Sequence, residues 1–417
     1  MSYETLEFCR NCGSDDFAEI LDLDYIYPSD FVLNDGGIEG APLVLVRCTL
    51  CDLVQLGHTV DLDMMYREYW YKSGLNASMV DSLQDVVDSV MSRIQLQPED
   101  AVIDIGCNDG TMLEMFPSYV TKIGFDPALN LADEAKPKVD YLVQDYFSAE
   151  AIHDPTLQAK VVTAIAMFYD LPDPNKFLSD VRSVIADDGL FVVQFTDLLS
   201  MLRINAFDNI CHEHLEYYSF FVLDNMFKNN DFTIYDISVN KVNGGSVRVY
   251  AKPSDVVMPA DIRDSVRNYA LEESQYLSSF DDPYLAFARR VDQYKRTLKS
   301  FLNSQLAVGK TIFVLGASTK GNTLLQYYGI DNSMIPYAAE VNQDKFGRKI
   351  VSTGIEIISQ EEALEKEPDQ FLVLPWHFID SFTENTDILD RGISLICPLP
   401  EPAVYYKMGS EYMRVFL

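Results

Sequence analysis

Apolar and polar positions along the chain alternate between two periods. Residues 101–105, 122–125, 161–166 and 190–195 are short apolar runs typical of buried strands. Between and before these strands, apolar residues recur at the intervals of a helix. This spacing is clearest over residues 76–96, where the apolar positions are Met79, Val80, Leu83, Val86, Val87 and Val90. Alternating strands and helices indicate a parallel sheet with helices on both faces, so we predict a doubly wound α/β domain.

The second half of the chain has a different pattern. Residues 232–237 and 246–251 predict antiparallel strands around the turn Asn243-Gly244-Gly245. An amphipathic helical stretch, 260–305, precedes further strands at 311–315, 335–339 and 371–374. These last strands predict a second, smaller α/β domain. The expected organisation is a small N-terminal lobe at 1–70, the α/β domain at 71–255, a helical connector at 256–305 and a C-terminal α/β domain at 306–417.

Composition and charge exclude several classes. The 417 residues carry 32 Lys and Arg against 64 Asp and Glu, a formal net charge of −32. Such acidity argues against binding to a phosphate backbone, so no nucleic-acid partner is expected. No apolar stretch approaches the ~20 residues of a membrane helix. The first residues are not basic and no apolar run follows them, unlike a signal peptide, so we expect a cytoplasmic protein without a membrane partner.

Four of the seven cysteines form two close pairs. Cys9 and Cys12 are separated by two residues, as are Cys48 and Cys51. Two such knuckles can place four thiolates around one zinc ion, and a site with four cysteines is structural because it leaves no ligand position open. We therefore predict a zinc ion that stabilises the N-terminal lobe. The alternative is two chance pairs of free cysteines.

A glycine-rich turn follows the first strand of the α/β domain. Residues 102–111 read V-I-D-I-G-C-N-D-G-T, in which Gly106 and Gly110 allow close approach of a ligand. The spacing is G-x-x-x-G and differs from the G-x-G-x-x-G of dinucleotide sites. Asp126 follows about 20 residues after the turn, as ribose-binding carboxylates do in such folds. The alternative is a structural glycine turn.

The segment 207–219, F-D-N-I-C-H-E-H-L-E-Y-Y-S, concentrates polar chemistry. His212 and His214 flank Glu213, and Tyr217 follows. It lacks the H-E-x-x-H spacing of zinc proteases. A histidine beside a carboxylate can act as a general base, and a tyrosine can hydrogen-bond a developing enolate oxygen. In an extended segment the two histidines share one face; on a helix they diverge, and the sequence leaves both open. A structural polar turn is the alternative.

A second glycine turn, Gly316-Ala-Ser-Thr-Lys320-Gly-Asn322, joins a predicted strand to a helix in the C-terminal domain. A helix N-terminus of this kind favours anions. Asn322 stands where a P-loop has lysine, so nucleoside triphosphate hydrolysis is not expected.

The cysteine knuckles, the 103–110 loop and the 212–219 segment together resemble the sugar C-methyltransferase family, exemplified by dTDP-4-keto-sugar 3-C-methyltransferases, over nearly the whole chain. The resemblance implies a zinc-binding lobe, a Rossmann-like class I methyltransferase domain that binds S-adenosylmethionine, and a C-terminal domain for a nucleotide-sugar substrate. Cys211 stands where some relatives have Tyr, and Phe168-Tyr169 where some have His.

By this resemblance, Asp126 binds the cofactor ribose and Asp145 contacts the adenine. Lys320 and neighbouring amides meet the substrate pyrophosphate, and Tyr71 belongs to an aromatic approach to the active site. The remaining cofactor residues implied are Asp104, Gly106, Asn108, Gly110, Met167 and Phe168. The remaining substrate residues implied are Tyr169, Glu340, Asn342 and Arg348.

The expected reaction is methylation of a nucleotide-activated keto-deoxy sugar at C3, beside a 4-ketone. His214 removes the C3 proton, and Glu213 or His212 orients His214 or balances its charge. Tyr217 or Tyr71 stabilises the enolate. The alternatives are an O- or N-methyltransferase and a non-catalytic sugar-nucleotide-binding protein. The protein is expected to be a monomer or a homodimer.

Overall fold

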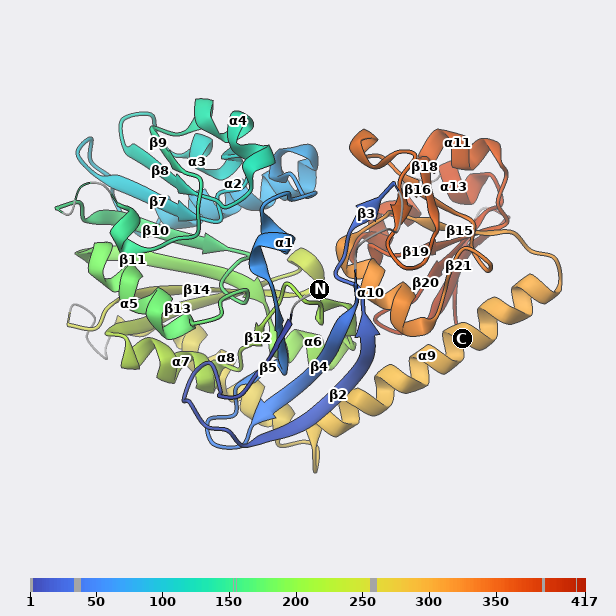
Figure 1. Cartoon of the computed structure of the whole chain (residues 1–417), viewed down its shortest axis with the longest axis horizontal. Helices are drawn as coiled ribbons and strands as arrows, with labels where there is room; N and C mark the ends of the chain where they lie inside the picture. Colours follow the sequence, from blue (N-terminus) through green and yellow to red (C-terminus); the bar gives the residue numbers. More distant parts are fainter. Residues whose placement is uncertain are drawn as a thin grey trace.

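The computed structural model describes residues 3–33, 39–152, 154, 156–255, 261–384, 387–409 and 411–417. Within these residues the strands form sheets of two, four, seven and nine strands. The seven-stranded and nine-stranded sheets each build a lobe, and the N-terminal strands lie between and below the two lobes (Figure 1). No helix in this part of the chain is both long and apolar enough to cross a membrane.

The seven-stranded sheet confirms the predicted doubly wound arrangement. Five neighbouring strands are parallel, and β14 and β13 add an antiparallel edge. In sheet order the strands are β13 (Phe232–Asn240), β14 (Ser246–Pro253), β11 (Ile185–Thr196), β10 (Ala159–Ile165), β7 (Ala101–Ile105), β8 (Thr121–Phe125) and β9 (Tyr141–Val143). β10 stops before the predicted end because Ala166 takes a left-handed conformation, φ 57°.

Helices cover both faces of this sheet. On one face, α2 (Ala77–Met91) packs Leu83 and Val86 against Val102 and Val192. The other face buries residues of α5 (Pro174–Val184) and α7 (Phe220–Asn229). Asn76 begins α2, because its side chain accepts a hydrogen bond from the Ser78 amide at 3.0 Å. The shorter helices are α1 (Leu62–Tyr66), α3 (Thr111–Met115), α4 (Ala132–Ala135) and α6 (Leu198–Ile204).

The nine-stranded sheet belongs mainly to the C-terminal lobe. Its centre is parallel and includes all three predicted strands of this region. In sheet order the strands are β22 (Glu411–Phe416), β21 (Ala403–Met408), β20 (Ser394–Cys397), β19 (Gln370–Val373), β15 (Ile312–Leu315), β16 (Tyr337–Glu340), β18 (Glu356–Ser359), β17 (Lys349–Ile350) and β3 (Phe31–Val32). The helices are α10 (Thr319–Tyr328), α11 (Gln360–Glu365), α12 (Ile379–Glu384) and α13 (Asp387–Asp390).

The N-terminal lobe shares strands with both other lobes. Its four-stranded sheet has the order β12 (Glu216–Tyr217), β5 (Val54–Leu56), β4 (Ala41–Cys48) and β2 (Phe17–Ile26). Its two-stranded sheet joins β1 (Tyr3–Thr5) to β6 (His58–Val60). β12 comes from the 207–219 segment, and β3 of the N-terminal lobe pairs with β17. These pairings cross the predicted domain bounds, which stay a prediction.

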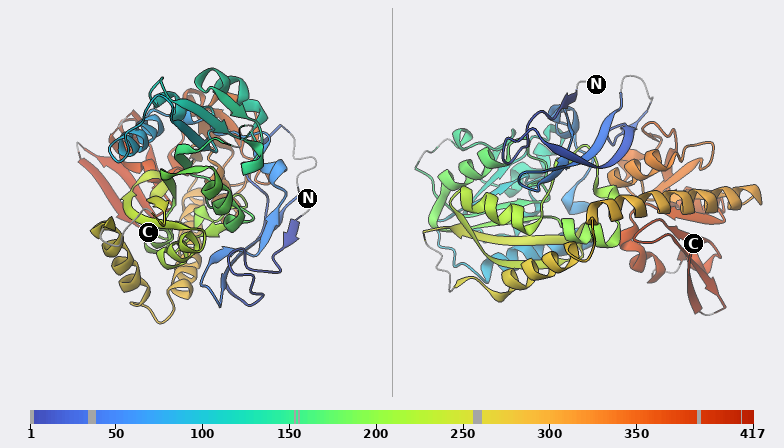
Figure 2. Two further views of the ribbon diagram at one scale, coloured as in Figure 1. Left: turned by 90° about the vertical axis from the view of Figure 1, so that its left-hand side faces the viewer. Right: turned by 90° about the horizontal axis from the view of Figure 1, so that it is seen from below.

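The predicted helical connector is two helices. Its expected start at residue 260 lies outside the described residues. α8 (Asp264–Leu277) packs on β13, and α9 (Pro283–Ala307) contacts α6 and β2. Asp282 separates them by capping α9 with its carboxylate, followed by Pro283. α9 extends from below the seven-stranded lobe to the outer side of the nine-stranded lobe, as Figures 1 and 2 show.

Candidate active site

A cavity of about 610 Å³ lies where the three lobes meet. It opens at the carboxyl ends of β7, β8 and β10, where ligands bind in doubly wound folds. Side chains converge on it from every lobe. Among the segments that contribute lining residues are 66–73, 104–108, 166–173, 208–214, 242–246, 318–320 and 374–378.

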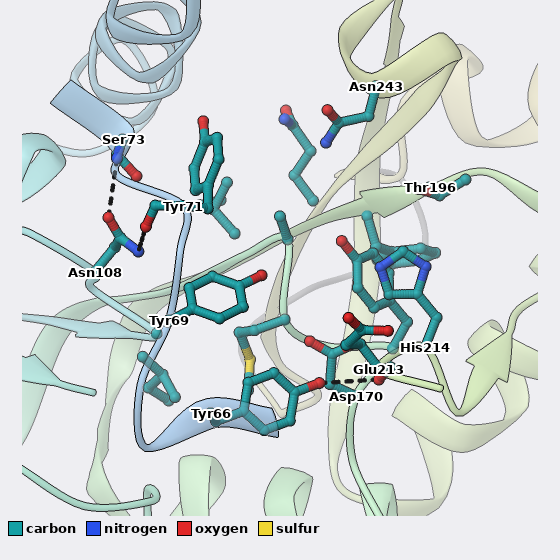
Figure 3. Close-up of a pocket in the computed structure, with 18 of the residues that line it drawn as sticks. Tyr66, Tyr69, Tyr71, Ser73, Asn108, Asp170, Thr196, Glu213, His214 and Asn243 are labelled. Carbon is teal, nitrogen blue, oxygen red and sulfur yellow. Dashed lines mark hydrogen bonds between the residues drawn. The ribbon is translucent and has the colours of Figure 1, made fainter. Parts of the chain in front are cut away.

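The loop after β7 brings backbone to the cavity. Gly106 has φ +75°, and a Cβ atom there would lie 3.1 Å from Met167 Cγ, so this position favours glycine. Asn108 then fastens the segment 66–74: its Oδ1 accepts from the Ser73 amide at 2.9 Å, and its Nδ2 donates to Tyr71 O at 3.0 Å (Figure 3). The loop forms a cradle that is open to a ligand.

Two buried carboxylates line the cavity beside this loop. Asp126 accepts from the amides of Asn108 and Ala128, at 2.7 and 2.9 Å. Burial raises its pKa, and these two hydrogen bonds oppose the rise. Asp104 accepts from Thr163 Oγ1 at 2.7 Å, and burial raises its pKa to about 7. Each carboxylate oxygen keeps a further lone pair, so the pair fits the hydroxyl donors of an adenosine group.

The other predicted cofactor residues divide into two sets. Met167 and Asp145 line the cavity, and Asp145 also pairs with Arg67 at 3.1 Å. Gly110 and Phe168 do not line it. Gly110, with φ +76°, begins α3 against the backbone of Ala135, and Phe168 is fully buried in the aromatic core.

The His-Glu-His segment turns, so its three residues face different surroundings. The His214 amide donates to Cys211 O at 3.1 Å. Glu213 and His214 then line the cavity, whereas His212 points away and donates from Nε2 to Ile26 O at 2.9 Å. The structure therefore brings one histidine, with the glutamate, to the cavity.

His214 has the protonation that a base needs. Its Nδ1 faces Asn209 O at 2.8 Å, and because a carbonyl only accepts, Nδ1 carries the proton and Nε2 has a free lone pair. Burial and the positive charge of Lys320 lower the pKa of His214 to about 3. The Tyr169 ring lies against the imidazole, with 4.1 Å between ring centroids.

Carboxyl groups surround this histidine. Glu213 Oε2 and Asp170 Oδ1 are buried without a hydrogen-bond partner among the described residues. Burial raises the pKa of both groups. Both line the cavity, so these acceptors are available to donors of a bound substrate.

Lys320 reaches the same region from the nine-stranded lobe. Its Nζ donates to Asn209 Oδ1 at 2.5 Å. Burial lowers its pKa, and the neighbouring Asp208, Cys211, Asp170 and Glu213 oppose this change. Lys320, a predicted substrate residue, thus lies beside the His-Glu-His segment.

The two predicted tyrosines differ in position. Tyr71 lines the cavity, and burial of its hydroxyl raises its pKa. Tyr217 lies outside the lining and donates its hydroxyl to Asn209 O at 3.1 Å. It supports the carbonyl that holds His214.

Three predicted substrate residues lie outside the cavity. Glu340 accepts from the Ala317 amide at 3.0 Å, and Asn342 caps a short helical turn through the Asp344 amide. Arg348 stacks on Trp70, with 4.6 Å from its Cζ to the ring centroid.

Lining side chains that sequence reasoning did not assign to the site include Tyr66, Tyr69, Thr196 and Asn243 (Figure 3). The Tyr66 hydroxyl donates to Glu213 O at 3.0 Å. The close spacing of Tyr66, Tyr69 and Tyr71 was an available signal. Thr196 and Asn243 had none, because the pairing of β11 with β14 brings them to the cavity.

The four cysteines of the N-terminal knuckles come together. Their sulfur atoms all lie within 4.8 Å of one another, with Cys9 to Cys51 at 3.6 Å and Cys12 to Cys48 at 3.5 Å. A tetrahedron with Zn–S bonds of ~2.3 Å has edges of about 3.8 Å, so the donor set fits zinc. Arg10, inside the first knuckle, donates to Leu56 O at 2.8 Å and lies 3.6 Å from Glu216.

Three known families match successive parts of the chain. They are described as a zinc binding domain (residues 9–66), a methyltransferase domain (79–237) and a C-methyltransferase C-terminal domain (241–400). The C-methyltransferase NovU from Streptomyces niveus is 30% identical over 408 residues, which cover 96% of this chain and 97% of NovU.

Solved structures of methyltransferases are similar to part of this chain. A magnesium protoporphyrin IX methyltransferase from Synechocystis, with bound S-adenosylhomocysteine, is 13% identical and covers 43% of this chain and 89% of its own, with a TM-score of 0.34. An S-adenosylmethionine-dependent methyltransferase from Clostridium acetobutylicum is 12% identical, covering 42% of this chain and 92% of its own, with a TM-score of 0.35.

Fold, cavity and family matches define a zinc-containing methyltransferase that uses S-adenosylmethionine. The full-length similarity is more specific. The chain belongs to the C-methyltransferase family, and it is an S-adenosylmethionine-dependent C-methyltransferase.

Proposed function

We propose that the protein methylates a nucleotide-activated keto-deoxy sugar at C3, beside a 4-ketone. The observation that carries this proposal is His214: a cavity-facing imidazole whose Nδ1–H is held by Asn209 O, which leaves Nε2 free to accept a proton. A carbon nucleophile needs such a base, because a sugar carbon must lose a proton before it can attack a methyl group. The sugar-nucleotide class comes from the resemblance of the motifs to sugar C-methyltransferases.

S-adenosylmethionine, when bound, supplies an electrophilic methyl group. Gly106, Asp104 and Asp126 would hold it, because they combine an open backbone cradle with unused acceptors. The rest of the reaction falls to the chain. His214 Nε2 takes the C3 proton, Glu213 and Asp170 accept hydrogen bonds from the sugar, and the aromatic residues Tyr66 and Tyr69 exclude water.

The cavity also reaches the nine-stranded lobe, where the far end of an extended substrate would lie. Ser318 and Thr319, at the N-terminal end of α10, line it on the side of the nine-stranded lobe. A nucleotide diphosphate would lie on this side, because a helix N-terminus favours anions. A monomeric or homodimeric state and a cytoplasmic location stay predictions.

The test is incubation with S-adenosylmethionine and a panel of dTDP-, UDP- and GDP-linked 4-keto sugars, followed by NMR of the product. A new methyl group on C3 supports the proposal. An O-methyl or N-methyl product would instead support the alternative transferases, and binding without turnover would support a non-catalytic role.

His214→Asn tests the base. The variant should lose both methyl transfer and the solvent deuterium exchange at C3, which needs proton removal and no methyl donor. S-adenosylmethionine affinity should stay nearly intact because the cofactor loop is a separate element. The matched control is His212→Asn, whose side chain lies outside the cavity. Exchange that persists in His214→Asn and fails in His212→Asn would assign the base to His212.

A further inference from the structure

Lys320 is a cationic side chain that belongs to the nine-stranded lobe and lies beside His214, the proposed base. It is the second residue of α10, and its Nζ donates to Asn209, which belongs to the 207–219 segment. It lines the cavity together with Asp170, Glu213 and His214. Its position is therefore set by the residues around the base.

Asn209 fixes the geometry between this cation and the base. Its side-chain Oδ1 accepts from Lys320 Nζ at 2.5 Å, and its backbone O accepts from His214 Nδ1 at 2.8 Å. Asn209 itself is nearly fully buried, and its Nδ2 donates to Ala206 O at 3.1 Å. One buried residue thus contacts both the ammonium and the imidazole and holds them side by side.

Such a cation assists proton removal beside a ketone. When the C–H bond breaks, negative charge develops on the carbonyl oxygen, and donors arranged at that oxygen stabilise the transition state. A buried, neutral histidine is a weak base, so the acceptor of the charge decides whether the step proceeds. Lys320 is the lysine among the lining residues that lies next to the base.

The surroundings of Lys320 do not suit a pyrophosphate. Asp208, Asp170 and Glu213 are its electrostatic neighbours. A doubly charged diphosphate in this position would face three carboxyl groups, whereas a ketone is neutral until the proton leaves. The sequence-based assignment of Lys320 to the pyrophosphate is therefore less favoured by the geometry.

We propose that Lys320 is a catalytic residue that holds the ketone oxygen of the substrate through its ammonium group, next to the base His214. This inference rests on the proposed function. His214 Nε2 takes the proton, the C–H electron pair becomes the C3–C4 double bond, and the carbonyl π pair moves to the oxygen beside Lys320. The carbonyl then re-forms as C3 bonds to the methyl carbon and the S–C electron pair returns to sulfur. His214 releases its proton to solvent.

Lys320→Ala in the full-length, zinc-loaded protein tests this role. Deuterium exchange at C3 should slow by roughly 10²–10³-fold, the usual effect of removing one such donor. Binding of dTDP alone and of S-adenosylmethionine should remain near wild type. Added ethylamine should restore part of the exchange rate, because a small primary amine can occupy the vacated site. Rescue requires a folded protein, so a folding defect cannot imitate it.

Lys345→Ala is the matched control. Lys345 is a lysine of the same lobe that donates to Ala317 O at 2.8 Å and does not line the cavity. The rate of deuterium exchange at C3 with the Lys345→Ala enzyme should stay close to the wild-type rate and should not change when ethylamine is added.

Two outcomes overturn the inference. Near-wild-type exchange in Lys320→Ala, with weakened dTDP binding, would make Lys320 a pyrophosphate ligand. Absence of exchange and methylation by the wild type on every keto sugar would overturn the proposed function, and the Lys320 role with it.

Discussion

The chemistry of His214 depends on the groups that meet its ring. A free histidine places its proton on either nitrogen and titrates near neutral pH. Here Asn209 O selects the Nδ1–H form, and burial keeps the ring neutral. The Tyr169 ring packs against it. Neighbouring groups thus set both the position and the protonation of this ring.

At Asp126 we expect a defect in cofactor binding. Asp126→Ala leaves the amides of Asn108 and Ala128 without their acceptor and removes the carboxylate expected at the ribose. Affinity for S-adenosylmethionine should fall by roughly 1–3 kcal/mol, the usual effect of unpairing buried polar groups. Isothermal titration calorimetry measures this. Asp140→Ala, which unpairs the Lys122 amide, is the control; equal losses in both variants would contradict the assignment.

His212 makes stability depend on pH. Burial lowers its pKa to about 4, whereas an unfolded histidine titrates near 6.5. The folded state binds fewer protons between these values, so this residue's contribution to stability decreases as pH falls. Between about pH 7.5 and about pH 5 this residue's contribution to the free energy of unfolding falls by about 2 kcal/mol.

His212→Asn should lack that dependence. The difference in unfolding free energy between wild type and variant should therefore shrink by about 2 kcal/mol over the same interval. Urea unfolding at both pH values measures it. A difference that is independent of pH would mean that His212 titrates normally in the folded protein.

The sequence could single out residues 212–214, because two of five histidines flank an acid. It could not tell which imidazole reaches the cavity. Strand periodicity would give both histidines one face, but the turn at Cys211 separates them. The role of Asn209 could not be predicted from the sequence either. It contacts His214 through its backbone carbonyl, a group that every residue has.

At the scale of elements, the segment 66–74 connects all three lobes. Asn108 holds its backbone at Tyr71 and Ser73. Trp70 donates to Asp30 Oδ1 at 2.8 Å and lies under Arg348. The cofactor loop and the nine-stranded lobe thus contact the same short segment, which positions its tyrosines between them.

The zinc knuckles also support the active site. Leu56 donates to Leu215 O, so β5 holds the chain directly after His214. Cys48→Ser should lose the expected zinc, about one ion per chain, and most of the methyl-transfer activity with it. Metal analysis and an activity assay test this. Cys397→Ser, a change in the nine-stranded sheet, should keep both the zinc and the methyl-transfer activity. Fully active, zinc-free Cys48→Ser protein would contradict the link.

At the scale of the whole molecule, periodicity predicted where the short buried strands of the α/β domain lie. The first strand of the α/β domain, 101–105, has the predicted bounds, because an apolar run between turns leaves little choice. Strands β3 and β12 could not be predicted, because two residues define no period. Their pairing depends on distant partners, and so does the cavity that lies between the lobes.

The pairing of β3 with β17 has a consequence for synthesis on the ribosome. Phe31 lies opposite Ile350, so one of the first strands to be made gains its partner roughly 300 residues later. At about 5–20 residues per second, this strand waits for a time on the order of half a minute. During that interval its backbone donors and acceptors are open to other partners, such as a chaperone. The cavity, which needs all three lobes, is completed only near the end of translation.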